Sequence, residues 1–107
     1  MANNYKNAKI DLSSTNDTTV YFCPTATQTI VKSILICNDS GSSDTLNITL
    51  TNTSSAVFSV FKAKSVASNT TVELLSQPLI IMESEILKAQ ATTADRLHII
   101  VSFLEVN

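Results

Sequence analysis

The chain has 107 residues, a common size for one domain. Only 15% of its residues are charged, the net charge is −2 and the seven basic residues are scattered, which argues against phosphate neutralisation and so against nucleic-acid binding. No apolar stretch approaches the roughly 18 residues that span a bilayer, so no membrane contact is expected.

Predicted elements begin after a polar start. Met1–Asn7 predicts a flexible N-terminal arm, and residues 8–107 predict a single domain. Short apolar runs then alternate with Ser, Thr, Asn and Asp clusters, a pattern typical of β-sandwiches and barrels. Strands are expected at Ala8–Leu12 and Thr18–Cys23, and Pro24 ends the second because proline cannot donate to a ladder.

The central part of the chain predicts two longer strands joined by a turn. Thr29–Asn38 is apolar on both faces, which predicts a central strand covered on both sides. Asn38–Asp44 is a turn, and we expect its Gly41, the only glycine of the chain, at a positive φ. Thr45–Thr51 alternates with a period of two, so its even-numbered residues should point inward.

The second half continues in the same way. Ala56–Val60 follows a turn at Asn52–Ser55 and is expected to be a strand with Phe58 as a core anchor, which Phe61–Val66 continues. Further strands are expected at Thr70–Leu75, Leu79–Met82, Glu85–Ala91 and Arg96–Val106.

These elements predict an all-β fold, an antiparallel β-sandwich of jelly-roll type with about eight short strands and no substantial helix. Sandwich and jelly-roll strand orders produce the same alternation, so the order stays open. Only Ser84–Ala94 also allows a helix, because its apolar residues fit spacings of three and four.

Catalytic motifs are missing from the sequence. A Ser-His-Asp hydrolase would have to use His98, the only histidine, but no Gly-x-Ser-x-Gly elbow is present and a single glycine leaves little flexible backbone for an oxyanion hole. We therefore expect no enzyme and no catalytic residue, and place His98 at a strand edge or subunit contact.

Metal and cofactor motifs are equally weak, so no metal and no cofactor are expected. Cys23, Cys37 and His98 have no zinc-site spacing, and the cysteines are expected as thiols, with a disulfide left open should the fold bring them together. The turn Asp39–Asp44 offers oxygen ligands to calcium but lacks the EF-hand spacing. No glycine-rich phosphate loop occurs.

Three glutamates remain as candidates for a polar site. Glu83 and Glu85 lie two residues apart and would share a face of a strand, where they could form a carboxylate pair; the alternative is a polar strand end or turn. Glu73 is interpreted as a mark of a solvent-facing surface.

Two apolar stretches are candidates for assembly surfaces, or alternatively for simple core. Leu79–Met82 would promote aggregation if exposed, and the C-terminal strand must pair inside the sheet or pack on a neighbouring subunit. The candidate assembly contacts are Tyr5, Leu79, Ile80, Ile81, His98, Phe103, Leu104 and Val106.

Several segments together carry a family resemblance. Thr19–Pro24 and Thr29–Ile34 resemble the opening of small structural proteins of tailed phages, especially phages of aquatic bacteria and cyanobacteria. Asn69–Leu75, Glu85–Leu87 and Leu97–Glu105 match the rest of that pattern. Members usually carry a glycine-containing turn after the second strand, which this chain lacks.

This resemblance implies a virion component made in the cytoplasm of a bacterial host. The first hypothesis is a capsid decoration (cement) protein, a homotrimer or other homo-oligomer whose partner is the major capsid protein or another virion protein. The second is a tail, neck or fibre-base adaptor of the same fold, and a non-phage carbohydrate- or protein-binding domain is the remaining alternative.

Overall fold

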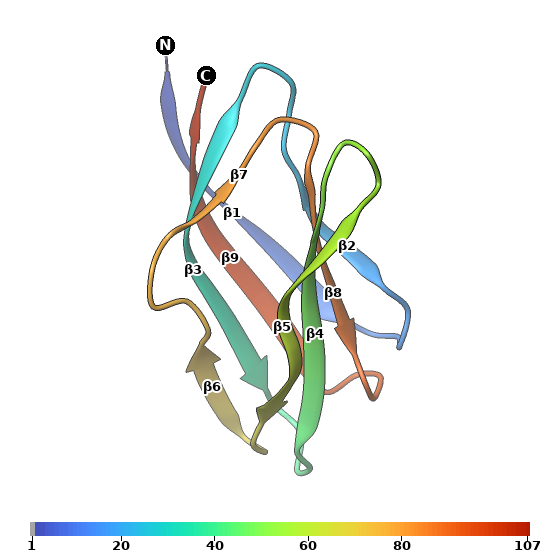
Figure 1. Ribbon diagram of the computed structural model, residues 1–107. Coiled ribbons are helices and arrows are strands. Elements are labelled where there is room, and N and C mark those ends of the chain that lie inside the picture. Colours follow the sequence, from blue (N-terminus) through green and yellow to red (C-terminus); the bar gives the residue numbers. More distant parts are fainter. Residues whose placement is uncertain (1) are drawn as a thin grey trace.

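The computed structural model describes residues 2–107, which form nine strands in two antiparallel sheets packed face to face (Figure 1). The strands are β1 (Asn3–Leu12), β2 (Thr18–Phe22), β3 (Gln28–Asn38), β4 (Asp44–Thr51), β5 (Val57–Val66), β6 (Thr70–Glu73), β7 (Leu79–Ile81), β8 (Ile86–Ala91) and β9 (Leu97–Val106). The expected all-β antiparallel sandwich is confirmed. The alternative helix at Ser84–Ala94 is wrong, because this segment contains β8.

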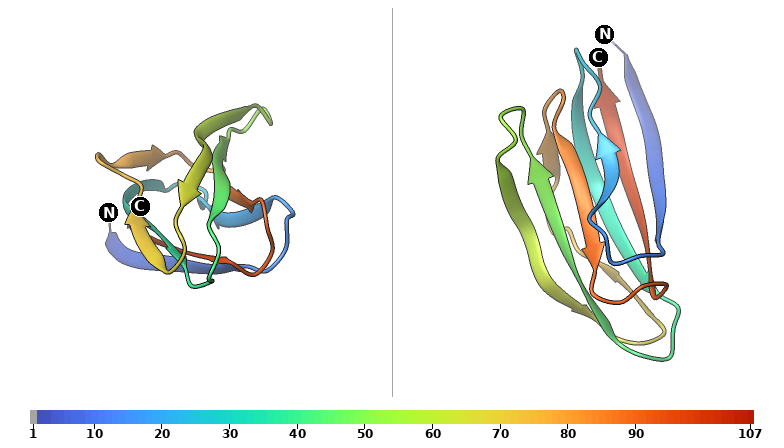
Figure 2. Two further views of the ribbon diagram at one scale, coloured as in Figure 1. Left: turned by 90° about the horizontal axis from the view of Figure 1, so that it is seen from below. Right: turned by 90° about the vertical axis from the view of Figure 1, so that its right-hand side faces the viewer.

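The strand order is that of a jelly roll. The larger sheet runs β1-β9-β3-β6, with β7 also paired to β3, and the smaller sheet runs β2-β8-β4-β5. Each strand of the first half pairs with one near the other end: β1 with β9, β2 with β8, β3 with β6 and β7, and β4 with β5. The chain is thus one long hairpin folded into two layers, which the side view in Figure 2 separates.

The core lies between the two sheets and follows the period of two. Leu97, Ile99, Val101 and Phe103 of β9 point inward and are buried. Leu46 and Ile48 of β4 are also fully buried, as the alternation predicts. Valine and isoleucine dominate these inner positions because branched side chains suit a pleated surface.

The expected flexible arm at residues 1–7 is wrong for residues 3–7, and Met1 lies outside the described residues. β1 begins at Asn3 and pairs with β9 through all ten of its residues. Ala2 and Asn107 extend this ladder with reciprocal N–H···O bonds of 2.6 and 3.0 Å. The polar side chains favour an arm, but every residue of this segment lies opposite a residue of β9 in the ladder.

One edge of the larger sheet is divided between two short strands, as the separate strands expected at Thr70–Leu75 and Leu79–Met82 predict. β7 pairs with β3 at Thr29–Val31, and β6 pairs with it at Leu35–Asn38. Between them β3 bulges, and the chain passes through Pro78, which cannot donate to the ladder. The Glu73 carboxylate accepts the Ile34 N–H at 2.8 Å, and so satisfies a donor beside the bulge.

Three local predictions fail. Gly41 does not have a positive φ; six other residues do, among them Ala63 with φ 51° inside β5 and Asn69 with φ 53° in a turn. Phe58 is not a core anchor, because it is 56% exposed near the start of the edge strand β5. β3 is central, but only one of its faces is fully covered.

Candidate assembly face

The outer face of the larger sheet consists of the side chains that point away from the core. Successive residues of a strand alternate between faces, so this surface receives every second residue of β1, β9 and β3. In β9 these residues are His98, Ile100, Ser102, Leu104 and Val106. A sheet that meets only water usually places polar residues here, and this one places three aliphatic residues.

A continuous apolar row crosses the outer face. Tyr5 of β1 lies opposite Leu104 of β9. Leu104 also lies opposite Ile30 of β3, which lies opposite Ile80 of β7. Directly opposed residues of neighbouring strands share a face and contact each other. We call these four residues the apolar row.

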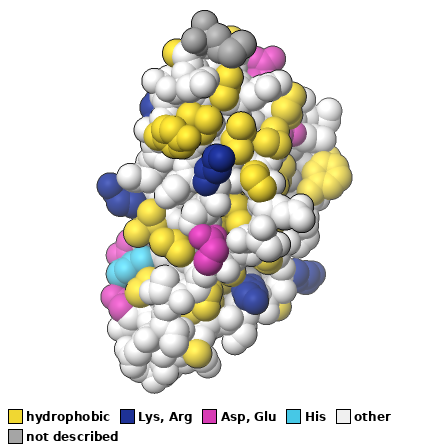
Figure 3. All heavy atoms as spheres, turned by 90° about the vertical axis from the view of Figure 1, so that its left-hand side faces the viewer, with side chains coloured by type: hydrophobic (Ala, Val, Ile, Leu, Met, Phe, Trp, Pro, Cys, Tyr) yellow, Lys and Arg dark blue, Asp and Glu magenta, His cyan; other side chains and the backbone are white. Residues whose placement is uncertain are grey.

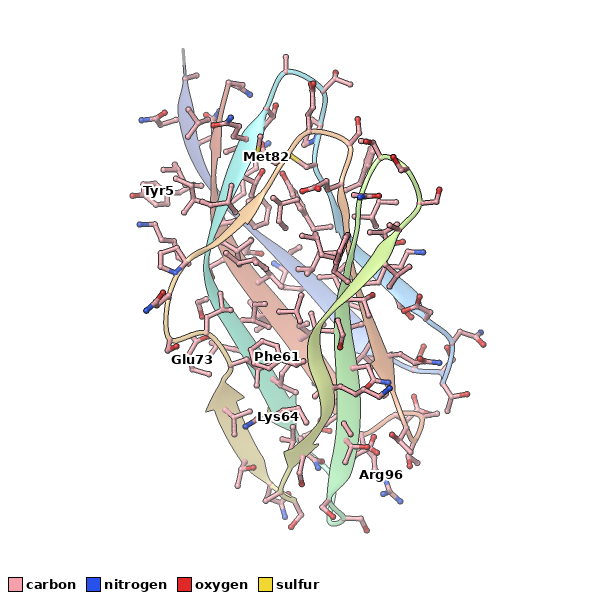
Figure 4. The ribbon with its side chains drawn as sticks, viewed as in Figure 1. Tyr5, Phe61, Lys64, Glu73, Met82 and Arg96 are labelled. Atoms are coloured by element: carbon pink, nitrogen blue, oxygen red, sulfur yellow. The ribbon has the colours of Figure 1, made fainter. Side chains whose placement is uncertain are left out.

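The apolar row is accessible. Tyr5 is 78% exposed and Ile80 is 48% exposed, and Figure 4 shows Tyr5 pointing away from the sandwich. Hydrophobic side chains gather over the upper part of this face in Figure 3. Further along β9, Ile100 is also exposed and lies opposite Leu35 of β3. Contiguous exposed apolar patches of this kind mark interaction surfaces in soluble proteins.

A cluster of two aspartates and a histidine lies at the end of the same face. His98 Nε2 lies 3.3 Å from Asp11 Oδ1, and His98 Nδ1 lies 3.8 Å from Asp39 Oδ2. Cys37 of β3 lies opposite His98 in the ladder. In residues 2–107, no serine or threonine hydroxyl hydrogen-bonds to His98, so the cluster has carboxylates but not the nucleophile–histidine pair of a hydrolase. Figure 3 shows the histidine between acidic side chains at the margin of the face.

A hydrogen-bonded network of polar side chains links the two sheets. Glu105 of β9, whose side chain is 5% exposed, accepts a bond from Lys6 Nζ of β1 at 2.8 Å. Its other oxygen accepts the Tyr21 hydroxyl of β2, and the Tyr21 oxygen lies 2.7 Å from Thr29 Oγ1 of β3. This network joins β1, β9 and β3 of one sheet to β2 of the other.

The contacts within this hydrogen-bonded network set the pKa values of its Glu105 carboxyl and Tyr21 phenol. Burial is the largest influence on the pKa of Glu105 and would raise it, but the bonds from Lys6 and Tyr21 together outweigh burial and lower the pKa. Burial and the bond to Glu105 raise the pKa of the Tyr21 phenol far above its usual range. The network therefore contains a carboxylate and a neutral phenol, a combination suited to holding the sheets together.

The candidate contacts fall into two groups. Tyr5, Ile80, Leu104, His98 and Val106 all lie on the outer face of the larger sheet, and the first three belong to the apolar row. Ile81 and Phe103 are buried between the sheets, and Leu79 packs against the core. Ile81 and Phe103 are therefore wrong as contacts, because side chains inside the sandwich cannot meet a partner.

Sequence reasoning missed Ile30 and Leu35 as members of the outer face. The available signal is that apolar residues occupy both alternating sets of positions in Thr29–Asn38, a pattern that also predicts cover by two layers. A second missed surface lies on the β4–β5 hairpin, where Val57 is 63% exposed beside Phe58.

The remaining sequence candidates have structural positions. Glu83 accepts the Ala26 N–H at 2.7 Å and so ties the β7–β8 turn to the β2–β3 loop, whereas Glu85 accepts the Met82 N–H at 2.8 Å and closes its own turn. Glu73 hydrogen-bonds to Ser33 and to backbone N–H groups; burial opposes its ionised form, but these bonds lower its pKa.

The potential metal ligands do not converge. Asp44 is buried and accepts the N–H of Thr93 at 3.1 Å. Cys23 is buried, Cys37 is half-buried, and both are free thiols. Within residues 2–107, no three His, Cys, Asp or Glu side chains form a group that could hold a metal ion. The same part of the chain contains no helix long and apolar enough to cross a membrane.

Comparisons with known proteins show one weak structural similarity and no match in sequence. No protein-family model and no curated protein match the sequence. Among solved structures, the chain is similar to one described as "Structure of infectious bursal disease virus Gt strain", with 8% identity and a TM-score of 0.41. The match covers 98% of this chain but 30% of that one. The jelly-roll assignment rests on the strand pairing of this chain itself.

Proposed function

We propose that the protein is a non-enzymatic structural component of a phage virion, a capsid decoration protein that self-associates and stabilises the head shell. The apolar row carries this proposal. A sheet face with Tyr5 and Ile80 exposed is more stable when a partner removes it from water, by roughly 25 cal/mol for each Å² of apolar surface buried.

The architecture supports the proposal at the level of analogy. Jelly rolls occur in viral capsid proteins, and also in lectins and cupins, so the fold alone does not select a function. The sequence resemblance to structural proteins of tailed phages favours the first of these groups. The interior Glu105 network adds a polar tie between the sheets, which suits a module that must keep its shape under load.

The outer face has the composition of a protein interface. Aliphatic and aromatic residues form the apolar row across its upper part, and the cluster of Asp11, His98 and Asp39 lies toward its margin. The apolar part would supply affinity for the major capsid protein, and the charged margin would fix orientation. Many copies bound in this way would stiffen a shell by avidity, even with weak individual contacts.

A second candidate is a tail, neck or fibre-base adaptor. The β4–β5 hairpin favours it, because exposed Val57 and Phe58 lie near the hairpin turn rather than on the outer face of the larger sheet. An adaptor that meets one partner by its face and another by its hairpin would use both surfaces.

Copy number in purified virions separates the two candidates. Quantitative mass spectrometry, with the major capsid protein as internal standard, should find a ratio near one copy per capsid subunit or a simple fraction of it. A few copies per hundred subunits would favour the adaptor. Absence of the protein from the particle would overturn both.

The outer face itself is tested by adding purified protein to shells that lack it. Ile80→Ser should weaken binding to the shell, because it replaces the exposed apolar side chain at the β7 end of the apolar row with a hydroxyl. Val57→Ser is the matched control, since Val57 is also an exposed apolar strand residue but lies on the hairpin. Equal loss for both variants, or none for Ile80→Ser, would contradict a decoration role for this face.

A further inference from the structure

The sheet edges differ in how well they are protected from pairing with another strand. β2 has five residues and a bulge, and β6 and β7 are short and separated by Pro78. β5 is long, but it has two register shifts against β4 and carries the exposed lysines Lys62 and Lys64. Short strands, bulges and lysines are the usual means of blocking an edge.

β1 is the exception. It has ten residues and pairs with β9 without a register shift, and it contains no proline. It forms the outer limit of the larger sheet in the side view of Figure 2. Of its two lysines, Lys6 is bound to Glu105 of the same chain, so only Lys9 remains to discourage pairing.

The direction of the β1 backbone groups follows from its first pair. Ala2 and Asn107 exchange both N–H···O bonds. In an antiparallel ladder such pairs alternate, so the even-numbered residues of β1 bond to β9. The odd-numbered residues Asn3, Tyr5, Asn7, Lys9 and Asp11 direct their N–H and C=O groups to the free edge. Antiparallel pairing with another strand would satisfy them.

We infer that β1 pairs antiparallel with β1 of a second copy, on a two-fold axis at Asn7. This register places Tyr5 opposite Lys9 of the partner copy, and Asn3 opposite Asp11. The Tyr5 ring, exposed in one chain, is then covered by the Lys9 stem and can meet its ammonium group in a cation–π contact. The apolar row of each copy continues onto the sheet of the other.

Charge repulsion and the extent of pairing favour this register over the alternative positions of the two-fold axis. A two-fold axis at Lys6 or at Lys9 would place identical lysines directly opposite each other, which destabilises a ladder. An axis at Ala8 avoids this clash but leaves Asn3 beyond the paired segment. An axis at Asn7 uses all five odd-numbered residues, although the Asp11 carbonyl already accepts one bond, from Ser13 N–H at 2.8 Å.

A closed two-fold pair leaves no further β1 edge, so the association stops at a dimer. This inference deepens and rests on the self-association in the proposed function. It concerns the purified protein alone, so its test needs no virion and can fail while the shell-binding result stands.

Analytical ultracentrifugation over a concentration series should show a monomer–dimer equilibrium for the wild type. Asn7→Pro should give a monomer, because it removes an N–H at the centre of the pair while keeping every β1–β9 bond. Asn7→Ser is the control and should remain dimeric. Circular dichroism and thermal melting establish that each variant is folded.

Cysteine cross-linking tests the register even if the proline variant fails to fold. In a Cys37→Ser background, oxidised Asn7→Cys should form a disulfide-linked dimer, because only residue 7 meets its own copy. Asn3→Cys, on the same face and edge, should not. A wild-type monomer at all concentrations, a trimer, or cross-linking of Asn3→Cys in place of Asn7→Cys would overturn the inference.

Discussion

The central strands of the two sheets differ in the side chains that they place on the outer faces. On the smaller sheet, β4 and β8 present the polar residues Thr45, Asn47, Thr49, Thr51, Lys88 and Gln90. On the larger sheet, the corresponding positions of β3 and β9 include Ile30, Leu35, Ile100 and Leu104. Both sheets cover the same core. The comparison teaches that folding does not require an apolar outer face along the central strands, since the outer positions of β4 are all polar; the apolar residues Phe22, Ile86 and Val57 gather at one end of this face.

The largest effect should separate the inner and outer faces of a single strand. Ile99→Ala should lower the free energy of unfolding by about 3 kcal/mol, because it opens a cavity between the sheets. The neighbouring Ile100→Ala should cost less than about 1 kcal/mol, because Ile100 already contacts water. Urea denaturation of dilute protein measures both values. If both variants lost a similar amount of unfolding free energy, Ile100 would be covered within a single chain, and the difference between the inner and outer faces of β9 would be contradicted.

An intermediate effect should come from the interior network, as a dependence of stability on pH. The pKa of Glu105 is lower in the folded chain than its ordinary value of 4.5, so its stabilisation is present above about pH 4.5 and is lost as the pH falls through the folded-state pKa. Glu105→Gln should cost about 2 kcal/mol at neutral pH and should flatten the acid limb of the stability curve.

The control for this second effect is Glu73, whose pKa is also lowered but whose side chain is exposed at the sheet edge. Glu73→Gln should leave most of the loss of stability at acid pH in place. If Glu73→Gln flattens the curve and Glu105→Gln does not, the tie between the sheets contributes little.

The smallest effect concerns the irregular edge of the smaller sheet. Ala63 has φ 51° in β5, a conformation that costs a non-glycine residue roughly 1–2 kcal/mol. Ala63→Gly should therefore raise stability by about 0.5 kcal/mol, after the added chain entropy is subtracted. Calorimetry should show a small increase in melting temperature. Ala67→Gly, in the loop after β5 and without a positive φ, should show none.

Much of the fold could be predicted from residue patterns, because alternation reports directly on burial. The inward residues of β4 and the split between Ile99 and Ile100 in β9 follow from a period of two. Alternation does not predict burial where burial depends on whether another element of the fold covers that part of the face. Phe58 has the right phase for burial, yet it stays exposed near the start of the edge strand β5.

The candidate site was only partly predictable for the same reason. Tyr5, Ile80 and Leu104 lie far apart in the chain, and the register of three strand pairs brings them into one row. Single-sequence patterns contain no register between distant strands. The polar residues of Asn3–Asn7 also conceal a strand, because the backbone pairing of this segment with β9 leaves no alternation of apolar residues in the sequence.

The position of β9 between β1 and β3 has a consequence for synthesis on the ribosome. Residues 97–106 are made after every other strand, yet they fill the middle of the larger sheet. Until they emerge, β1 and β3 have no common neighbour and both keep open edges. The nascent chain must wait for its last strand, which favours slow folding and makes chaperone binding to the waiting strands advantageous.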